Sequence, residues 1–168
     1  MPNDEYLDLV DENDQVIEKK LRSEVYLQGL SNFRVINVLI RNSKGELWIP
    51  RRTAHKRLFP LGLDVSAGGH VESGEDYQST LEREVFEEIR IDLKITPFTL
   101  LGKLTPQQGL SCFMQVYEIQ SDQVPDFNPE DYFEYYWLSP TELLKRIENG
   151  DICKSDLPKI IQHFYIDQ

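Results

Sequence analysis

The chain has few basic residues, few cysteines and no long apolar segment, and each shortage excludes a class of protein. Its 18 lysines and arginines stand against 29 aspartates and glutamates, a net charge of −11 in 168 residues. Such an acidic chain has no general attraction for nucleic-acid phosphates or anionic membranes. No run approaches the roughly 20 apolar residues that cross a bilayer. We therefore expect no nucleic-acid partner and no membrane partner.

The two cysteines and the N-terminal residues indicate the compartment. Cys112 and Cys153 lack a metal-like spacing, which predicts free thiols in a reducing environment. Residues 1–5 are acidic and lack the apolar core of a signal peptide. Together these features predict a cytoplasmic protein. Its hydrophobic content of 40% also excludes a mainly disordered chain.

Residue patterns predict one α/β domain over residues 1–168, with a mixed sheet flanked by helices. Residues 7–10 and 15–18 flank a turn-forming cluster, so residues 1–30 are expected to add an N-terminal β-hairpin. Further strands are expected over residues 33–40, 46–49, 61–67, 94–101, 113–119 and 135–138. Helices are expected over residues 75–90, from residue 140, and over 157–165.

One segment concentrates the acidic charge. Between residues 69 and 91, seven acidic residues accompany two arginines, a net charge of −5. On the predicted helix, Glu84, Glu87 and Glu88 fall within a sector of about 100°, beside the apolar stripe. Clustered carboxylates near the carbonyls of a Gly-Gly turn suit Mg²⁺ or Mn²⁺. The segment therefore indicates a cation site, and a solvated helix face is the alternative.

The spacing of this segment resembles the box of the Nudix hydrolases. Eight of its nine defined positions match: Gly69, Glu75, Arg83, Glu84, Val85, Glu87, Glu88 and Ile91. The ninth, a glycine, is Arg90 here. It is expected either to end the helix in a left-handed conformation, at about 1 kcal/mol, or to let the helix end differently. The resemblance extends over residues 33–144, through Arg51-Arg52, residues 67–70 and residues 137–140.

With its extra hairpin, the chain looks most similar to the Nudix branch near isopentenyl-diphosphate isomerase, and within it to the nucleotide-hydrolysing members. The resemblance implies a Nudix-type α/β/α sandwich. An isomerase is disfavoured because that family has its catalytic cysteine where this chain has Gly68. A non-catalytic nucleotide-binding module is the third alternative. It is disfavoured because the box glutamates are all present.

The resemblance implies a pyrophosphohydrolase that cleaves nucleoside di- or triphosphates, or other nucleoside-diphosphate-linked compounds, by attack of water on phosphorus. It implies Mg²⁺ or Mn²⁺ held by Glu84, Glu87 and Glu88 with the Gly68 carbonyl. Arg83 would orient the glutamates. Either Glu84 or a distal acid would be the general base, and the loop candidates for an extra acid are Glu130, Asp131 and Glu134.

The main basic cluster is either a solvated loop or a contact for substrate phosphates. It consists of Arg51, Arg52, Lys56 and Arg57. The expected partner is a small-molecule nucleotide, and the oligomeric state is left open, with a homodimer as one option. His70 is expected to be a loop histidine without a special role. Glu75 is expected to favour the helix dipole or to support the metal ligands.

Overall fold

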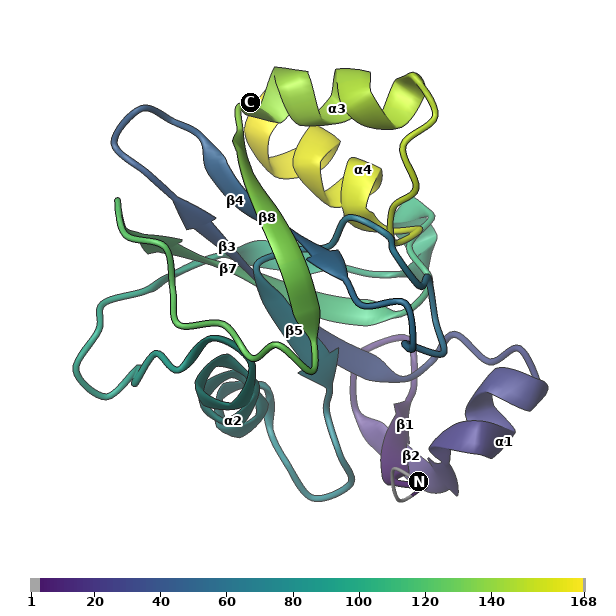
Figure 1. The fold of residues 1–168 in the computed structure, drawn as a ribbon. Coiled ribbons are helices and arrows are strands. Elements are labelled where there is room, and N and C mark those ends of the chain that lie inside the picture. Colours follow the sequence, from purple (N-terminus) through teal and green to yellow (C-terminus); the bar gives the residue numbers. More distant parts are fainter. Residues whose placement is uncertain (1–3, 168) are drawn as a thin grey trace.

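The computed structural model describes residues 4–167 and arranges them as helical layers on the two faces of one mixed sheet (Figure 1). An N-terminal hairpin of β1 (Tyr6–Val10) and β2 (Val16–Leu21) leads into α1 (Arg22–Leu27). The central strands are β3 (Arg34–Arg41), β4 (Leu47–Arg52), β5 (Ala67–His70), β6 (Thr99–Leu104), β7 (Phe113–Gln120) and β8 (Tyr132–Leu138). The later helices are α2 (Tyr77–Ile89), α3 (Pro140–Glu148) and α4 (Leu157–Ile161), with a 3₁₀ turn at Pro106–Gln108 and a π-helical turn at Gln162–Ile166.

The sheet order is β6-β7-β3-β4-β8, and β5 also pairs with β3. Strands β3 and β7 run parallel, while the other pairs are antiparallel. The predicted α/β fold class, with a mixed sheet and an extra N-terminal hairpin, is confirmed.

Alternation along β3 divides the core into two layers. Ile36, Val38 and Ile40 pack against the apolar side of α2. Leu39 faces the opposite layer, which contains residues of α3, α4, α1 and the N-terminal hairpin. Figure 1 shows α2 alone on one side of the sheet and α3 and α4 on the other. Period-two alternation places Asn37 on the Leu39 side, where it is the buried polar residue of this strand.

The strand before the box lies later than predicted. A strand was expected over residues 61–67, ending at the two glycines, but β5 runs through both of them. Both positions suit glycine because side-chain atoms of neighbouring elements approach the backbone closely there. A Cβ at Gly69 would lie 2.2 Å from Cδ of Glu84, and one at Gly68 would lie 2.7 Å from Oδ1 of Asn37. The strand propensity of glycine is poor, which is why sequence patterns place the boundary wrongly.

The N-terminal hairpin is attached to the box segment by two aspartates. Asp8 accepts hydrogen bonds from the Ser73 hydroxyl at 2.8 Å and from the Gly74 amide at 3.1 Å. Asp14, at the hairpin turn, accepts from Arg34 and Tyr77 and pairs with Lys103. The hairpin therefore supports the loop that leads into α2. In the part of the chain that the structure describes, no helix is long and apolar enough to cross a membrane.

Candidate active site

Helix α2 presents the acidic residues and has defined ends. Asp76 caps its start, because its carboxylate accepts from the Ser79 amide at 2.7 Å. Arg90 ends it in the left-handed conformation with φ of 55°, and its amide donates to the Phe86 carbonyl. The helix thus ends as a box glycine would end it, with an arginine in the strained position.

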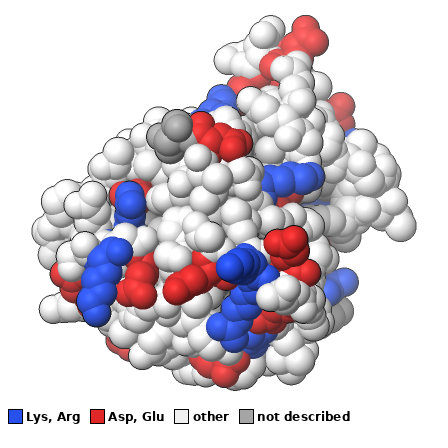
Figure 2. Space-filling model, turned by 90° about the horizontal axis from the view of Figure 1, so that it is seen from above, with Lys and Arg blue, Asp and Glu red and all other residues white. Residues whose placement is uncertain are grey.

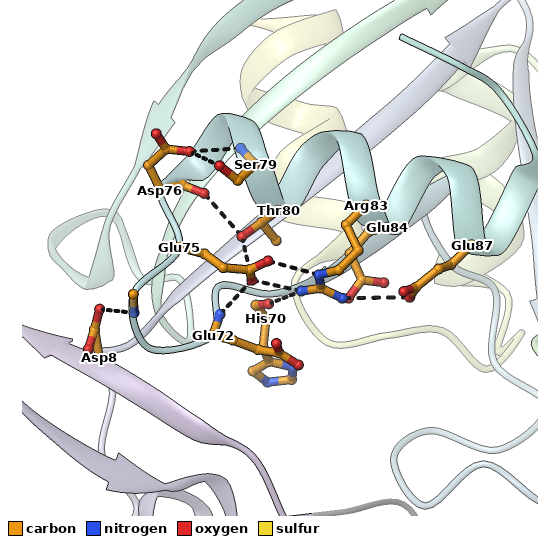
Figure 3. A network of polar contacts seen from close by, with 11 residues as sticks. Asp8, His70, Glu72, Glu75, Asp76, Ser79, Thr80, Arg83, Glu84 and Glu87 are labelled. Atoms are coloured by element: carbon orange, nitrogen blue, oxygen red, sulfur yellow. Dashed lines mark hydrogen bonds and ion pairs between the residues drawn. The ribbon is translucent and has the colours of Figure 1, made fainter. Parts of the chain in front are cut away.

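Arg83 gathers the carboxylates around one guanidinium, as Figure 3 shows. Its Nε and Nη2 donate to the two oxygens of Glu75 at 2.9 and 2.8 Å. Its Nη1 donates to Glu84 at 2.8 Å and lies 3.6 Å from Glu87. Burial raises the pKa of Glu75, but the hydrogen bonds from Arg83, the Glu72 amide and Thr80, together with the charge of Arg83, hold that pKa below its ordinary value. Glu75 and Glu84 are thereby oriented by one shared cation.

The remaining acidic groups differ in their surroundings. Burial raises the pKa of Glu84 to about 7, although Arg83 opposes this shift. The pKa of Glu88 is also raised well above its ordinary value, by burial and by the charge of Glu84. Glu88 accepts one hydrogen bond, from the Gly68 amide at 2.7 Å, and forms no ion pair among the described residues. The Glu87 side chain is 57% exposed.

The donor set fits a hard divalent cation in its chemistry. Among residues 4–167, no three Asp, Glu, His or Cys side chains already converge as metal ligands would. The reason is that Arg83 draws Glu84 and Glu87 toward itself. Since the amide and carbonyl of one strand residue point to the same strand edge, the Gly68 carbonyl lies on the edge that faces Glu88. Carboxylates and a carbonyl are the ligand types that Mg²⁺ and Mn²⁺ take.

A cavity of about 630 Å³ borders these groups. Its wall includes Glu84 and Glu88 from α2, Gly68 from β5, Arg52 at the end of β4, and Lys56 from the segment after β4. Arg52 pairs with Asp64 at 2.7 Å, and Lys56 pairs with Asp131 at 2.6 Å. Two of the four predicted phosphate contacts therefore line the cavity.

The other two basic residues lie outside the cavity wall. Arg57 is exposed. Arg51 uses all five of its N–H donors on protein acceptors. Its neighbour Arg52 faces the cavity because successive strand residues point to opposite faces. Contacts within the protein therefore use all the donors of Arg51, and no substrate contact is needed to explain this residue.

The loop acids separate in the same way. Asp131 lines the cavity beside Lys56. Glu134 pairs with Arg51 at 2.7 Å, and Glu130 is exposed, so neither lines it. Glu134 lies on β8 and not in the expected loop, and of the three candidate acids Asp131 is the one that shares the cavity wall with Glu84 and Glu88.

A cluster of aromatic side chains completes the cavity wall, and the sequence patterns did not predict it. The Tyr26 hydroxyl lies 2.6 Å from Nε2 of His70, and the His70 ring stacks on Phe33 with centroids 5.6 Å apart. Burial lowers the pKa of His70 to about 3, so the ring is neutral at physiological pH. No sequence signal links Tyr26 to the box, because it lies on a short helix in the extension.

The charge on one face of the molecule is mixed in sign. Figure 2 shows the face on the α3 side, where acidic and basic side chains lie interspersed, with no broad basic patch. This arrangement does not favour an extended polyanion on that face.

A cluster of carboxylates on one helix, beside a glycine strand and a cavity with cationic side chains, is the kind of site found in enzymes of phosphate-ester or anhydride chemistry. The NUDIX domain family matches residues 31–155. The chain belongs to the Nudix family and is a hydrolase that acts on pyrophosphate bonds.

Relatives are similar over nearly the whole chain. An uncharacterized Nudix hydrolase of Nostoc is 56% identical over 96% of both chains. A Nudix hydrolase of Deinococcus radiodurans is 44% identical over 99% of this chain and 97% of its own. The crystal structure of DR0079 from Deinococcus radiodurans superposes with a TM-score of 0.90, at 44% identity, over 96% of this chain and 99% of that one.

Proposed function

We propose that this protein is a Mg²⁺- or Mn²⁺-dependent pyrophosphohydrolase that cleaves nucleoside di- or triphosphates, or related nucleoside-diphosphate-linked compounds. The observation that best supports this proposal is the excess of carboxylates over cations beside the cavity. One guanidinium faces Glu75, Glu84 and Glu87, and Glu88 stands next to them without an ion pair among the described residues. A divalent cation would offset this excess.

Glu84, Glu87, Glu88 and the Gly68 carbonyl would hold the cation. When bound, the metal supplies charge neutralisation for the diphosphate and lowers the pKa of a water. Arg83 orients Glu75 and Glu84 through its fork of donors. Glu84 is the proposed general base, because its carboxylate lines the cavity beside the other acids of the box.

On the substrate side, Arg52 and Lys56 are the proposed phosphate contacts, since both line the cavity. Each is already paired with an acid, Asp64 or Asp131, which fixes its position. Arg51 and Arg57 are left out of this set because neither lines the cavity. Asp131 is the distal acid that could replace Glu84 as the base.

The isomerase alternative is further weakened by the packing at Gly68. A side chain there would meet Oδ1 of Asn37 at 2.7 Å and the Ile36 carbonyl at 2.9 Å, measured from its Cβ. The catalytic cysteine of that family would therefore not fit without movement of the sheet. Gly68→Cys is expected to give no isomerase activity.

The reaction is tested with heavy-oxygen water and a panel of nucleotides, with products resolved by mass. Water attack on phosphorus predicts label in a phosphate product and no turnover with a chelator present. Label in the nucleoside sugar would overturn the mechanism. Absence of turnover with Mg²⁺ and with Mn²⁺ would favour a non-catalytic binding module.

A further inference from the structure

One largely buried side-chain amide in the cavity wall makes few hydrogen bonds with the rest of the chain. Asn37 is 4% exposed and lies on β3 opposite Gly68. On the same face of the strand its neighbours Val35 and Leu39 are apolar. An asparagine between apolar residues at a buried position is unusual unless its amide has a polar partner.

The hydrogen bonds of Asn37 are incomplete. Its Nδ2 donates to the Met114 sulfur at 3.4 Å, a weak acceptor. Its Oδ1 accepts no hydrogen bond within the described part of the chain, and it does not belong to the buried side-chain atoms that lack a partner, so it is open to the cavity. Because this acceptor faces the cavity and no group of the chain uses it, it is available to a partner from outside the chain.

Asn37 also has access to the cavity. It lines the wall together with Gly68, and the missing side chain of Gly68 leaves room for the amide. Val65 and Met114 lie in the same wall, and Phe59, which is 36% exposed, offers an aromatic ring. The surroundings of the amide thus suit a flat, uncharged group.

We propose that Asn37 is a specificity-determining residue that reads the hydrogen-bonding edge of the substrate's heterocyclic base. An amide presents a donor and an acceptor together, and base edges offer the complementary pair. Phosphate oxygens only accept, so they would leave Oδ1 unsatisfied. Arg52 and Lys56 already supply cationic donors for them. This inference rests on the proposed function, because it assigns the nucleoside end of the same substrate.

The first test compares wild type with Asn37→Ala on ADP, GDP, CDP, UDP and ribose 5-diphosphate, which has no base. Wild-type kcat/KM should differ at least tenfold between the best and the worst base. Asn37→Ala should lower kcat/KM for the best nucleotide at least tenfold, mainly through KM. It should leave ribose 5-diphosphate within threefold. Met114→Leu removes the sulfur contact but keeps the amide, so it should retain the wild-type order of bases.

Two results of this test would overturn the inference. An equal loss with ribose 5-diphosphate would show that Asn37 serves the phosphates or the metal ligands. If Asn37→Ala kept the wild-type order of kcat/KM among the bases, the amide would not determine base specificity.

A second measurement is independent of hydrolysis and of the alanine variant's folding. The side-chain amide resonances of Asn37, assigned by their loss in Asn37→Ser, should shift when a phosphate-free nucleoside (adenosine, guanosine, cytidine or uridine) is added to wild type. No shift with any of the four would overturn the inference. Failure of wild type to hydrolyse any diphosphate would instead overturn the proposed function, so the two failures are distinguishable.

Discussion

Two arginines organise networks of carboxylates, and the networks differ in their balance of charge. Arg51 donates to Glu134 at 2.7 Å and holds Asp151 with two bonds at 2.9 and 3.0 Å. Arg146 also donates to Asp151, at 2.9 Å. Two cations thus meet two carboxylates, away from the cavity wall.

The Arg83 network is unbalanced. One cation serves Glu75, Glu84 and Glu87, and Glu88 adds a fourth carboxylate nearby. The same kind of arginine fork therefore completes a structural junction in one place and leaves acidic charge available in the other. A candidate cation site is therefore distinguished by the number of carboxylates that have no cationic partner, and not by the presence of an arginine.

Glu88→Gln should have the largest effect, because it removes an unmatched acid and keeps the side-chain shape. Hydrolysis should fall at least about 100-fold. The metal-free variant should melt at the wild-type temperature or higher, since like-charge repulsion is relieved. Mn²⁺ at about 100 times its dissociation constant should stabilise wild type by roughly 2.7 kcal/mol and the variant much less.

Glu82→Gln is the matched control for this experiment, because Glu82 lies outside the Arg83 network and interacts with Gln78. It should change neither activity nor the response to Mn²⁺. If metal-free Glu88→Gln were strongly destabilised and Mn²⁺ stabilised both proteins equally, Glu88 would be a structural residue.

The two networks should respond oppositely to pH in the metal-free protein. Burial raises the pKa of Glu84 from 4.5 to about 7, so the folded state binds this proton more tightly than the unfolded chain. The stabilising contribution is complete below pH 4.5 and is lost as the pH rises through about 7, by at most about 3 kcal/mol. Glu84→Gln should reduce this decline in denaturant unfolding with EDTA, and Glu88, whose pKa is also raised by burial, should account for the decline that remains.

The Arg51 network supplies the contrast within the same titration. Hydrogen bonds from Arg51 hold the pKa of Asp151 below 3.8, so its contribution is present above that pH and lost on acidification. A decline between pH 4.5 and 7 that persists in Glu84→Gln at full size would assign it to other groups.

Asp151→Asn should destabilise the protein, the opposite sign to Glu88→Gln. It leaves Arg51 and Arg146 without their shared carboxylate. We expect a loss of about 2 kcal/mol, measured by thermal unfolding. The kcat/KM of the folded variant should stay within threefold of wild type. Lost activity without lost stability would instead assign Arg51 to the substrate.

Arg90→Gly should have the smallest effect. It tests whether Arg90, the residue that ends α2, takes part in the cluster of carboxylates around Arg83. Arg90 is exposed, and its left-handed backbone favours glycine. The variant should gain up to about 1 kcal/mol in denaturant unfolding and keep its activity and Mn²⁺ response. A weaker Mn²⁺ response would place Arg90 in the site after all.

Local spacing predicted the part of the site that lies on one helix. The acidic sector of α2 follows from residue periodicity, and the box resemblance added Arg83 and the Gly68 carbonyl. The capping box of α3 was equally local, since Ser139 and Glu142 exchange hydrogen bonds with each other's backbone amides. Such features need no knowledge of distant contacts.

Features that depend on tertiary contacts were missed. Helix α1 has six residues and no side-chain cap, so no periodic pattern marks it. The separation of Arg51 from Arg52 depends on which face of β4 meets the cavity. The amide of Asn37 stands in an apolar strand pattern, where a sequence alone cannot show that its partner is missing.

The attachments of Asp14 also order the events of folding during synthesis. Its partners Arg34, Tyr77 and Lys103 lie 20, 63 and 89 residues further along the chain. This hairpin is synthesised before its partners, so it cannot complete its contacts until β6 has been made. Contacts of such long sequence separation form late. The extension, although synthesised before these partners, is expected to complete its attachment to the domain and its part of the cavity wall only when they are in place.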